Sequence, residues 1–408
     1  MTEVSICAYP WDLIGDPAAG QRLAKTGADR VAIAAAYHSV RAATPLHPAH
    51  RLVDAKTAAF YVPVRPPAWS TRRLVPQAAR NWESGGMHVA ADPFGQAART
   101  ALAAGLRVDA WVVLLHSTVL GEANPDLCVR NAFGDVYTYA LCPGNSEVIE
   151  YAATLVTEVA ELAGSSGATG LMVEACGPLG VSHLGHHDKT VGAEWTATDE
   201  ALLSLCFCAG CSAGMLEAGL DDGALAAVVR ASVGGGTESV DKALGTDADV
   251  LRYFREGTTA ELAARVLASA REAGIQRLGF HAQPDPWAVG PFASMAMTRP
   301  GRGLTGAVSA ATFILPGHAA LQMPPEEIST LASAAHAGAL GAYVSALPPH
   351  NAAALEADWR QLRDRGFDEL CIYHFGLLSS RRLSAVSHAV AALKHQASES
   401  TTTGPNSP

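Results

Sequence analysis

The sequence predicts an α/β fold, a (β/α)8 TIM barrel built as a single domain with long loops after its strands. Short apolar runs recur along the 408 residues, and helical patterns separate them. That alternation is typical of a parallel sheet covered by helices. Several runs end in polar or aromatic side chains, as strands do at the catalytic mouth of barrel enzymes. No Gly-x-Gly-x-x-Gly opens a helix after the first run, so an open dinucleotide-binding sheet has little support.

The eight expected strands are residues 4–9, 30–37, 107–115, 169–175, 276–282, 305–311, 340–346 and 369–375. Helices are expected between them at 17–25, 94–104, 148–162, 199–220, 223–232 and 379–394. Thr258-x-x-Glu261 matches a capping box and predicts a helix that begins there and runs to residue 274. Pro325 is expected at the first position of another helix.

One domain is expected over residues 1–395, followed by a Ser/Thr/Pro-rich tail, 396–408, that is predicted to be disordered. The connection between the second and third strands is long, and such connections often form substrate walls. The Gly-rich stretch around His183, His186 and His187 is expected to be a polar loop facing the substrate.

Composition excludes some classes of partner. The formal net charge of −10 argues against nucleic acid and against anionic membranes, which attract basic surfaces. No apolar run approaches the roughly 20 residues of a membrane-spanning helix. The first ten residues match a strand rather than a signal peptide, so a cytoplasmic protein with reduced cysteines is expected. A homo-oligomer is possible.

Glu174 closes the apolar run Gly170-Leu-Met-Val-Glu174, the expected fourth strand. A carboxylate in an apolar strand is costly unless it is paired or functional. At the C-terminal end of a barrel strand, Glu174 would lie where barrel enzymes keep their catalytic groups. We therefore predict that Glu174 is a general acid/base whose pKa is raised by its apolar neighbours.

Other strand ends supply candidate partners for Glu174. The catalytic candidates beside it are His281 and Asp285 after the fifth strand, although Asp285 could simply cap its turn. Aromatic rings and histidines in one cleft suit a carbohydrate, which offers ring faces and hydroxyls. The predicted substrate-binding residues are Trp11, Asp12, Tyr37, His38, Arg41, His116, Trp287, Tyr373 and His374.

No cofactor or metal is expected from these patterns. Cys206-Phe-Cys208-Ala-Gly-Cys211 is the densest group of thiols, and three thiols at this spacing could bind zinc. The fourth ligand is missing nearby, although Cys176 or a loop histidine could complete the set. Buried, reduced cysteines that pack a helix are the favoured interpretation.

Three segments carry a family resemblance: residues 106–117 (LRVDAWVVLLHS), residues 124–147 (NPDLCVRNAFGDVYTYALCPGNSE) and the run ending at Glu174. With them, the chain resembles uncharacterised (β/α)8-barrel proteins related to glycoside hydrolases. The resemblance implies a barrel that acts on a glycoside, with Glu174 as the acid of the fourth strand. Many such barrels carry a second carboxylate on strand five, six or seven. Here the seventh strand ends without an acid, which leaves Asp285 or Asp12 as the second carboxylate.

Three functions follow from these observations. The first is cleavage of a glycosidic bond in a small carbohydrate or glycoside, with Glu174 as general acid/base. The second is isomerisation, epimerisation or lyase chemistry on a sugar-like metabolite, with histidines transferring protons. The third is a barrel that binds a sugar without turning it over.

Overall fold

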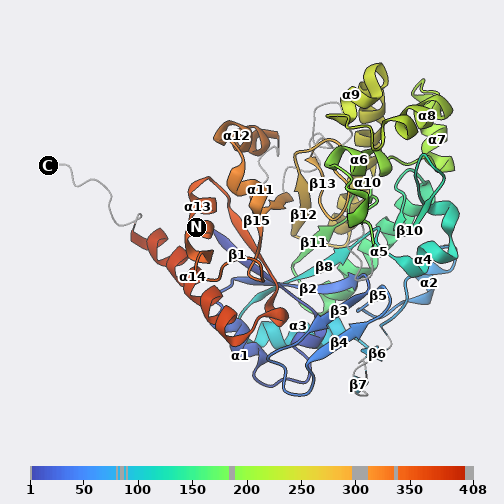
Figure 1. The fold of residues 1–408 in the computed structure, drawn as a ribbon. Coiled ribbons are helices and arrows are strands. Elements are labelled where there is room, and N and C mark those ends of the chain that lie inside the picture. Colours follow the sequence, from blue (N-terminus) through green and yellow to red (C-terminus); the bar gives the residue numbers. More distant parts are fainter. Residues whose placement is uncertain are drawn as a thin grey trace.

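The computed structural model describes residues 2–79, 81–82, 87–88, 91–182, 189–295, 311–334 and 339–399. Within these residues, eight parallel strands close into a barrel, because β1 pairs with both β2 and β16 (Figure 1). The fold is the predicted (β/α)8 barrel. Its strands are β1 (Glu3–Ala8), β2 (Arg30–Tyr37), β8 (Arg107–Val113), β11 (Gly170–Glu174), β12 (Arg277–Gln283), β14 (Ala311–Pro316), β15 (Ala339–Ser345) and β16 (Glu369–Tyr373).

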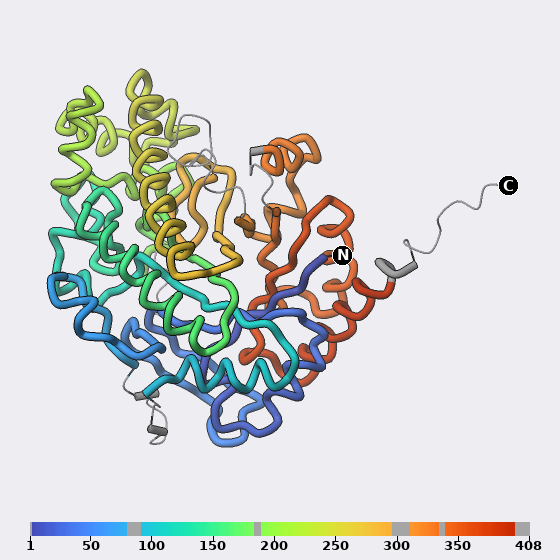
Figure 2. Tube along the Cα trace, turned by 180° about the vertical axis from the view of Figure 1, so that it is seen from behind, coloured from blue at the N-terminus to red at the C-terminus, as the bar shows by residue number. Residues whose placement is uncertain are grey.

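Helices cover the outside of the barrel. The longest are α5 and α10, which pack against each other and lie side by side in the view from behind (Figure 2). Both bury an apolar face, as expected for helices between barrel strands. The covering helices are α1 (Ala19–Lys25), α3 (Pro93–Ala103), α5 (Ser146–Ser165), α10 (Ala248–Glu272), α11 (Gly317–Gln322), α12 (Pro325–Ala334), α13 (Leu355–Asp364) and α14 (Ser380–Glu399). None of the described helices combines the length and the apolar character needed to cross a membrane.

Three predicted elements differ from the structure. The sixth strand is β14, Ala311–Pro316, whereas the predicted segment 305–311 lies outside the described residues except for Ala311. A strand that is buried on both faces needs a continuous apolar run, and residues 311–315 supply it. The prediction that a helix begins at a Thr258 capping box is wrong. The helix α10 begins at Ala248, and the Thr258 hydroxyl donates to the Phe254 carbonyl inside it. The helix expected over 199–220 is two helices, separated at residues 204–208.

Long insertions follow three of the strands. After β2 come β3 (Val40–Ala43), β4 (Leu52–Ala55), β5 (Ala59–Phe60), α2 (Pro66–Trp69), β6 (Asn81–Trp82) and β7 (Met87–His88). After β8 come α4 (Thr118–Ala123) and the antiparallel pair β9 (Cys128–Arg130) and β10 (Val136–Leu141). After β11 come α6 (Ala197–Leu203), α7 (Ala209–Glu217), α8 (Asp222–Ser232) and α9 (Val240–Leu244), gathered together in Figure 1. The short strand β13 (Ala293–Ser294) follows β12.

Alternate residues of the strands fill the barrel interior, because side chains of a strand point to opposite faces in turn. On β16 these residues are Glu369, Cys371 and Tyr373, at three successive heights. At the middle height, the Cys371 Sγ lies 3.6 Å from the Sγ of Cys7 and 3.6 Å from the Sδ of Met172. This apolar, sulfur-rich layer separates two polar ends of the barrel.

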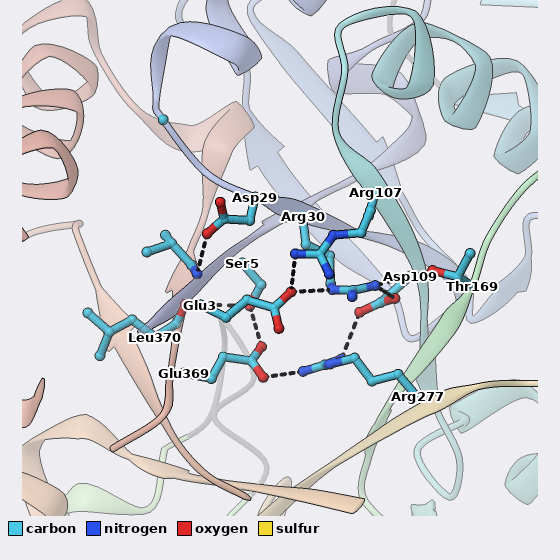
Figure 3. A network of polar contacts seen from close by, with 12 residues as sticks. Glu3, Ser5, Asp29, Arg30, Arg107, Asp109, Thr169, Arg277, Glu369 and Leu370 are labelled. Atoms are coloured by element: carbon cyan, nitrogen blue, oxygen red, sulfur yellow. Dashed lines mark hydrogen bonds and ion pairs between the residues drawn. The ribbon is translucent and has the colours of Figure 1, made fainter. Parts of the chain in front are cut away.

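The end formed by the strands' first residues is closed by ion pairs (Figure 3). The Asp109 carboxylate accepts hydrogen bonds from Arg30 Nη1 at 2.6 Å and from Arg277 Nη1 at 2.7 Å. Arg277 also pairs with Glu369, whose other oxygen accepts from the Ser5 hydroxyl at 2.8 Å. A side chain at Gly170 would overlap Asp109, so glycine is needed there. Each buried charge in this network has an opposite charge in contact.

Candidate active site

Glu174, the last residue of β11, carries its carboxyl group at the opposite end of the barrel, the C-terminal mouth. The side chain is buried, and Trp111 Nε1 donates a hydrogen bond to its Oε2 at 2.9 Å. Burial raises the pKa of Glu174 to about 7, and the hydrogen bond from Trp111 opposes that shift. A carboxyl group with such a pKa can both donate and accept a proton near neutral pH.

The chain turns sharply after Glu174. Ala175 has a φ of 56°, in the left-handed region that alanine rarely adopts, and its N–H donates to the Pro291 carbonyl at 2.9 Å. Strained backbone of this kind gathers at functional sites, where neighbouring structure holds it in place. The turn ends the strand at Glu174 and fixes the carboxyl group at the mouth.

His281 lies beside Glu174 on the neighbouring strand β12. Its Nδ1 is 3.7 Å from Glu174 Oε2, and its ring stacks on Phe292 with the centroids 4.8 Å apart. Neither ring nitrogen has a hydrogen-bond partner within the described part of the chain. Burial lowers the pKa of His281 to about 3, so the imidazole is neutral at physiological pH. A neutral imidazole has one donor and one acceptor nitrogen, with which it can hydrogen-bond to the hydroxyl groups of a ligand.

Three tyrosine hydroxyl groups meet near the barrel axis. The Tyr9 hydroxyl lies 3.4 Å from those of Tyr37 and Tyr373. Burial is the main cause that raises the pKa of all three phenols. They therefore remain protonated at neutral pH and can donate hydrogen bonds to an oxygen-rich ligand.

These groups open into a cavity of about 450 Å³, a size suited to a small ligand. Within the described part of its lining, Glu174 is the only carboxylate. His38 and His116 form one wall, their rings stacked with centroids 4.5 Å apart. The lining residues are Tyr37, His38, His116, Tyr139, Glu174, Ala175, Leu179, Ser182, His281, Gly290, Pro291, Phe292, Tyr343 and Tyr373.

Half of the residues predicted for the site line this cavity: Tyr37, His38, His116, Glu174, His281 and Tyr373. Three others are buried together behind Tyr9, whose ring packs against those of Trp11 and His374 at 4.6 and 4.1 Å between centroids. His374 Nδ1 is 3.7 Å from Asp12 Oδ2, which also accepts from the Tyr9 N–H at 2.7 Å. Burial raises the pKa of Asp12 to about 8 and lowers that of His374 to about 3.

The remaining predicted residues lie in the insertions that follow β2 and β12, and none is part of the described lining. Asp285 is exposed, and its Oδ1 accepts from the Trp287 N–H at 2.9 Å, which caps its own turn. The Trp287 indole donates to Asp241 Oδ2 at 3.1 Å. Arg41 is exposed on β3. The histidine-rich stretch 183–188 lies outside the described residues.

The site residues that were not predicted for it include Trp111, Tyr139, Phe292 and Tyr343. Tyr343 and Trp111 each lie two residues before the last residue of a strand, rather than after its end. The period of two along β8 could have indicated Trp111, because it shares a face with Asp109. Tyr139 and Phe292 reach the cavity from insertions, and the sequence carries no local signal for that placement.

The thiols predicted as a possible metal site come together with a fourth. Cys206, Cys208 and Cys211 are joined by Cys142, and not by Cys176. Cys142 follows β10, far from the other three in sequence. The four sulfur atoms form the group of potential metal ligands found within the described chain.

Solved glycoside hydrolases have the same fold. The catalytic domain of a β-amylase from Paenibacillus polymyxa matches with a TM-score of 0.53 and 14% identity, over 96% of this chain and 98% of that chain. A β-galactosidase from Marinomonas ef1 matches with a TM-score of 0.55 and 10% identity, over 98% of this chain and 60% of that one. The α-L-fucosidase isoenzyme 2 from Paenibacillus thiaminolyticus matches with a TM-score of 0.56 and 11% identity, over 98% of this chain and 51% of that one.

The chain therefore spans only 60% and 51% of the last two proteins. At these identities the likeness shows the fold alone, the (β/α)8 barrel found in glycoside hydrolases. No protein-family model and no curated protein sequence matches the chain.

Proposed function

We propose that the protein is a glycoside hydrolase that acts on a small carbohydrate or glycoside, with Glu174 as its general acid/base. One observation carries the proposal: a buried carboxyl group with a pKa of about 7 opens into a cavity at the C-terminal mouth of a barrel. Raised carboxyl pKa values are typical of the acid in glycosidases. The barrel folds of the β-amylase, the β-galactosidase and the fucosidase support the same class.

In this scheme, protonated Glu174 donates its proton to the glycosidic oxygen while the bond from that oxygen to the anomeric carbon breaks. Water then adds to the anomeric carbon and returns a proton to Glu174, so protons balance over one turnover. The phenols of Tyr37 and Tyr373 are placed to donate hydrogen bonds to sugar hydroxyls. The aromatic rings of the lining supply faces on which a sugar can stack.

Glu174 has no carboxylate opposite it in the described lining. Two-carboxylate glycosidases separate these groups by about 5–5.5 Å or about 6.5–9.5 Å, with the bond to be cleaved between them. His281 lies only 3.7 Å from Glu174, so both groups approach a substrate from the same side. We therefore assign His281 to hydrogen bonding with the substrate on the same side as Glu174. Asp12 and Asp285 remain candidates from the sequence only.

Hydrolysis of aryl glycosides tests the proposal. The full chain is incubated with a panel that includes aryl β-galactosides and aryl α-L-fucosides, and the released phenol is measured. We expect one glycoside to be cleaved by the wild type and not by Glu174→Gln. The matched control is Glu217→Gln, the same change at an exposed site on α7, which keeps the wild-type rate. Cleavage by Glu174→Gln at the wild-type rate would contradict the assignment.

Proton transfer on a sugar-like metabolite is the second candidate, because His281 is a neutral base beside a carboxylic acid. An isomerase or epimerase of this kind exchanges a substrate C–H proton with solvent. Deuterium incorporation from D2O into a ketose or aldose, seen by NMR and lost in His281→Asn, would favour it over hydrolysis. A sugar that binds without either reaction would identify a binding barrel.

A further inference from the structure

A compact group of four thiols lies outside the candidate active site. The Sγ atoms of Cys142, Cys206, Cys208 and Cys211 all lie within 4.8 Å of one another, and those of Cys142 and Cys211 are 3.4 Å apart. Cys206 is half-buried and the other three are buried. Cys142 follows β10, whereas Cys206, Cys208 and Cys211 lie between α6 and the first turn of α7. The group therefore connects the insertions after β8 and after β11.

We propose that Cys142, Cys206, Cys208 and Cys211 bind one structural Zn²⁺ ion. Zinc takes four cysteine ligands in a tetrahedron with Zn–S distances of about 2.3 Å, which sets sulfurs about 3.8 Å apart. The cluster already has nearly that spacing. Four thiolates leave no open position on the metal, so the ion would be structural and not catalytic.

Donors surround the sulfur atoms. The N–H groups of Arg130 and Cys208 both donate to the Sγ of Cys206 at 3.4 Å, and the Gly144 N–H donates to Cys142 Sγ at 3.4 Å. The Asn145 side-chain amide donates to Cys208 Sγ at 3.6 Å. Hydrogen bonds to sulfur stabilise the thiolate form that binds metal, and such outer groups also orient the ligands.

A buried cation accompanies the cluster. Arg255 on α10 is buried and lines a small cavity of about 30 Å³ with Cys142, Cys206 and Cys211. Asp285 is a negative neighbour of Arg255. A buried guanidinium is costly without negative charge nearby. Zn²⁺ with four thiolates carries a net charge of −2, which Arg255 partly offsets, whereas four neutral thiols would offer Arg255 no charge.

Two glycines let the loops approach. A Cβ atom at Gly144 would lie 2.6 Å from the Sγ of Cys211, and one at Gly210 would overlap the Gly144 carbonyl. Real side chains do not tolerate such contacts, so the loops can bring their sulfurs together only because both positions lack a side chain. The residues around the cysteines, and not the cysteines alone, fit a shared ligand.

The ion would hold part of the cavity wall in place. Tyr139 on β10 lines the active-site cavity, and its hydroxyl lies 2.6 Å from the Gly180 carbonyl in the insertion after β11. Leu179 and Ser182 of that insertion also line the cavity. The proposed zinc site joins the same two insertions, so we infer that it positions this wall relative to Glu174.

Metal analysis of the purified full chain, prepared without a histidine tag, tests the site. We expect about one zinc per chain by mass spectrometry, and loss of that zinc in Cys142→Ser and Cys208→Ser. Cys128→Ser is the matched control: Cys128 is buried and, among the described residues, its Sγ donates to backbone carbonyls, so this variant keeps its zinc. Iron in place of zinc, or zinc retained in both Cys142→Ser and Cys208→Ser, would overturn the proposal.

A second measurement needs no variant, in case a serine variant does not fold. A mercurial reagent is titrated into the native wild-type protein with a zinc indicator present, and we expect zinc release to follow the reaction of four thiols. Protein grown with cobalt is expected to show sulfur-to-cobalt charge-transfer absorption typical of a tetrahedral sulfur site. A wild-type protein that holds no metal, whose four thiols react freely or form a Cys142–Cys211 disulfide, would exclude the site.

Discussion

The two ends of the barrel differ in the partners of their buried carboxyl groups. At the end formed by the strands' first residues, Asp109 lies between Arg30 and Arg277, and Glu369 contacts Arg277 in turn. At the C-terminal mouth, Glu174 is also buried, but its partners are the Trp111 indole and a neutral imidazole. Along β8 and β11, only a few residues separate these environments.

The difference separates stability from chemistry. Paired charges cost little to keep buried while both partners are present, and removal of one leaves the other uncompensated. An unpaired carboxyl group keeps its proton to higher pH, which costs stability but supplies an acid near pH 7. We therefore expect changes at Asp109 to act on folding and changes at Glu174 to act on activity.

Glu174→Gln removes the acid at the C-terminal mouth of the barrel, and we expect it to give the largest effect. Because glutamine cannot transfer a proton, we expect kcat to fall by about 10²- to 10⁴-fold, the usual contribution of a general acid. The amide keeps the shape of the side chain, so the circular dichroism spectrum stays that of the wild type. Steady-state kinetics on the best aryl glycoside measures the effect, with Glu217→Gln as the control. A fall in affinity for the sugar with unchanged kcat would contradict the acid role.

Asp109→Asn disrupts the ion-pair network at the opposite end of the barrel. The change removes the negative charge between two guanidinium groups whose side chains are 5% and 15% exposed. We expect the free energy of unfolding to fall by about 3–5 kcal/mol in urea titrations. Asp249→Asn, which breaks an ion pair at a carboxylate that is 84% exposed, is the control and leaves the urea midpoint unchanged. Equal urea midpoints for Asp109→Asn and Asp249→Asn would contradict a stabilising role for the buried ion pairs of Asp109.

The raised pKa of Glu174 should make stability depend on pH. The pKa of Glu174 is raised to about 7, so the native state binds this proton more tightly than the unfolded state. The wild type therefore loses stability as pH rises from about 4.5 to about 7, and Glu174→Gln does not. We expect the stability of Glu174→Gln relative to wild type to rise by about 2–3 kcal/mol between pH 5 and pH 8.

Urea titrations of both proteins at the two pH values give this difference. Asp12 and His374 also titrate, but both proteins contain them, so their contributions largely cancel in the difference. Glu217→Gln is the control and shows no such change with pH. A stability of Glu174→Gln relative to wild type that falls toward pH 8 would contradict a raised pKa of Glu174 in the native state.

Trp111→Phe removes the hydrogen bond that Glu174 accepts within the described part of the chain, and we expect it to give the smallest effect. The indole N–H stabilises the ionised carboxylate, so its loss raises the pKa of Glu174 further. An acid must be protonated to work, and activity falls at high pH as Glu174 ionises. We expect the alkaline limb of kcat/KM to move upward by about one pH unit. Trp69→Phe, at a buried tryptophan that packs on Phe60 and Tyr151, leaves the limb in place. A downward shift in Trp111→Phe would contradict the assignment.

The fold could be predicted because each strand and helix leaves a local pattern. Apolar runs and helical spacing placed seven of the eight strands. The sixth was expected at 305–311, of which only Ala311 lies within the described residues; the strand at this place in the barrel begins at Ala311, where a continuous apolar run begins. The cytoplasmic location, the domain boundary and the disordered tail stay predictions, and so does the oligomeric state.

The candidate site could be predicted where a polar side chain lies at the predicted end of a strand. Glu174 and His281 lie among the last residues of β11 and β12, and both were expected at strand ends from the sequence. Trp11 and Asp12 also follow a strand, but the 3-10 turn at Pro10–Asp12 carries them behind Tyr9. Cys142 joins the other thiols through a tertiary contact between two insertions, which no local pattern encodes.

Glu174 keeps its proton to near-neutral pH because it is buried and no opposite charge faces it among the described residues. The direct measurement is a carbon-13 NMR titration of the full chain labelled at the glutamate carboxyl carbons, with Glu174→Gln to identify the resonance. We expect this resonance to titrate with a pKa of about 7. A Glu174 resonance that titrates at the ordinary glutamate value of about 4.3 would contradict it.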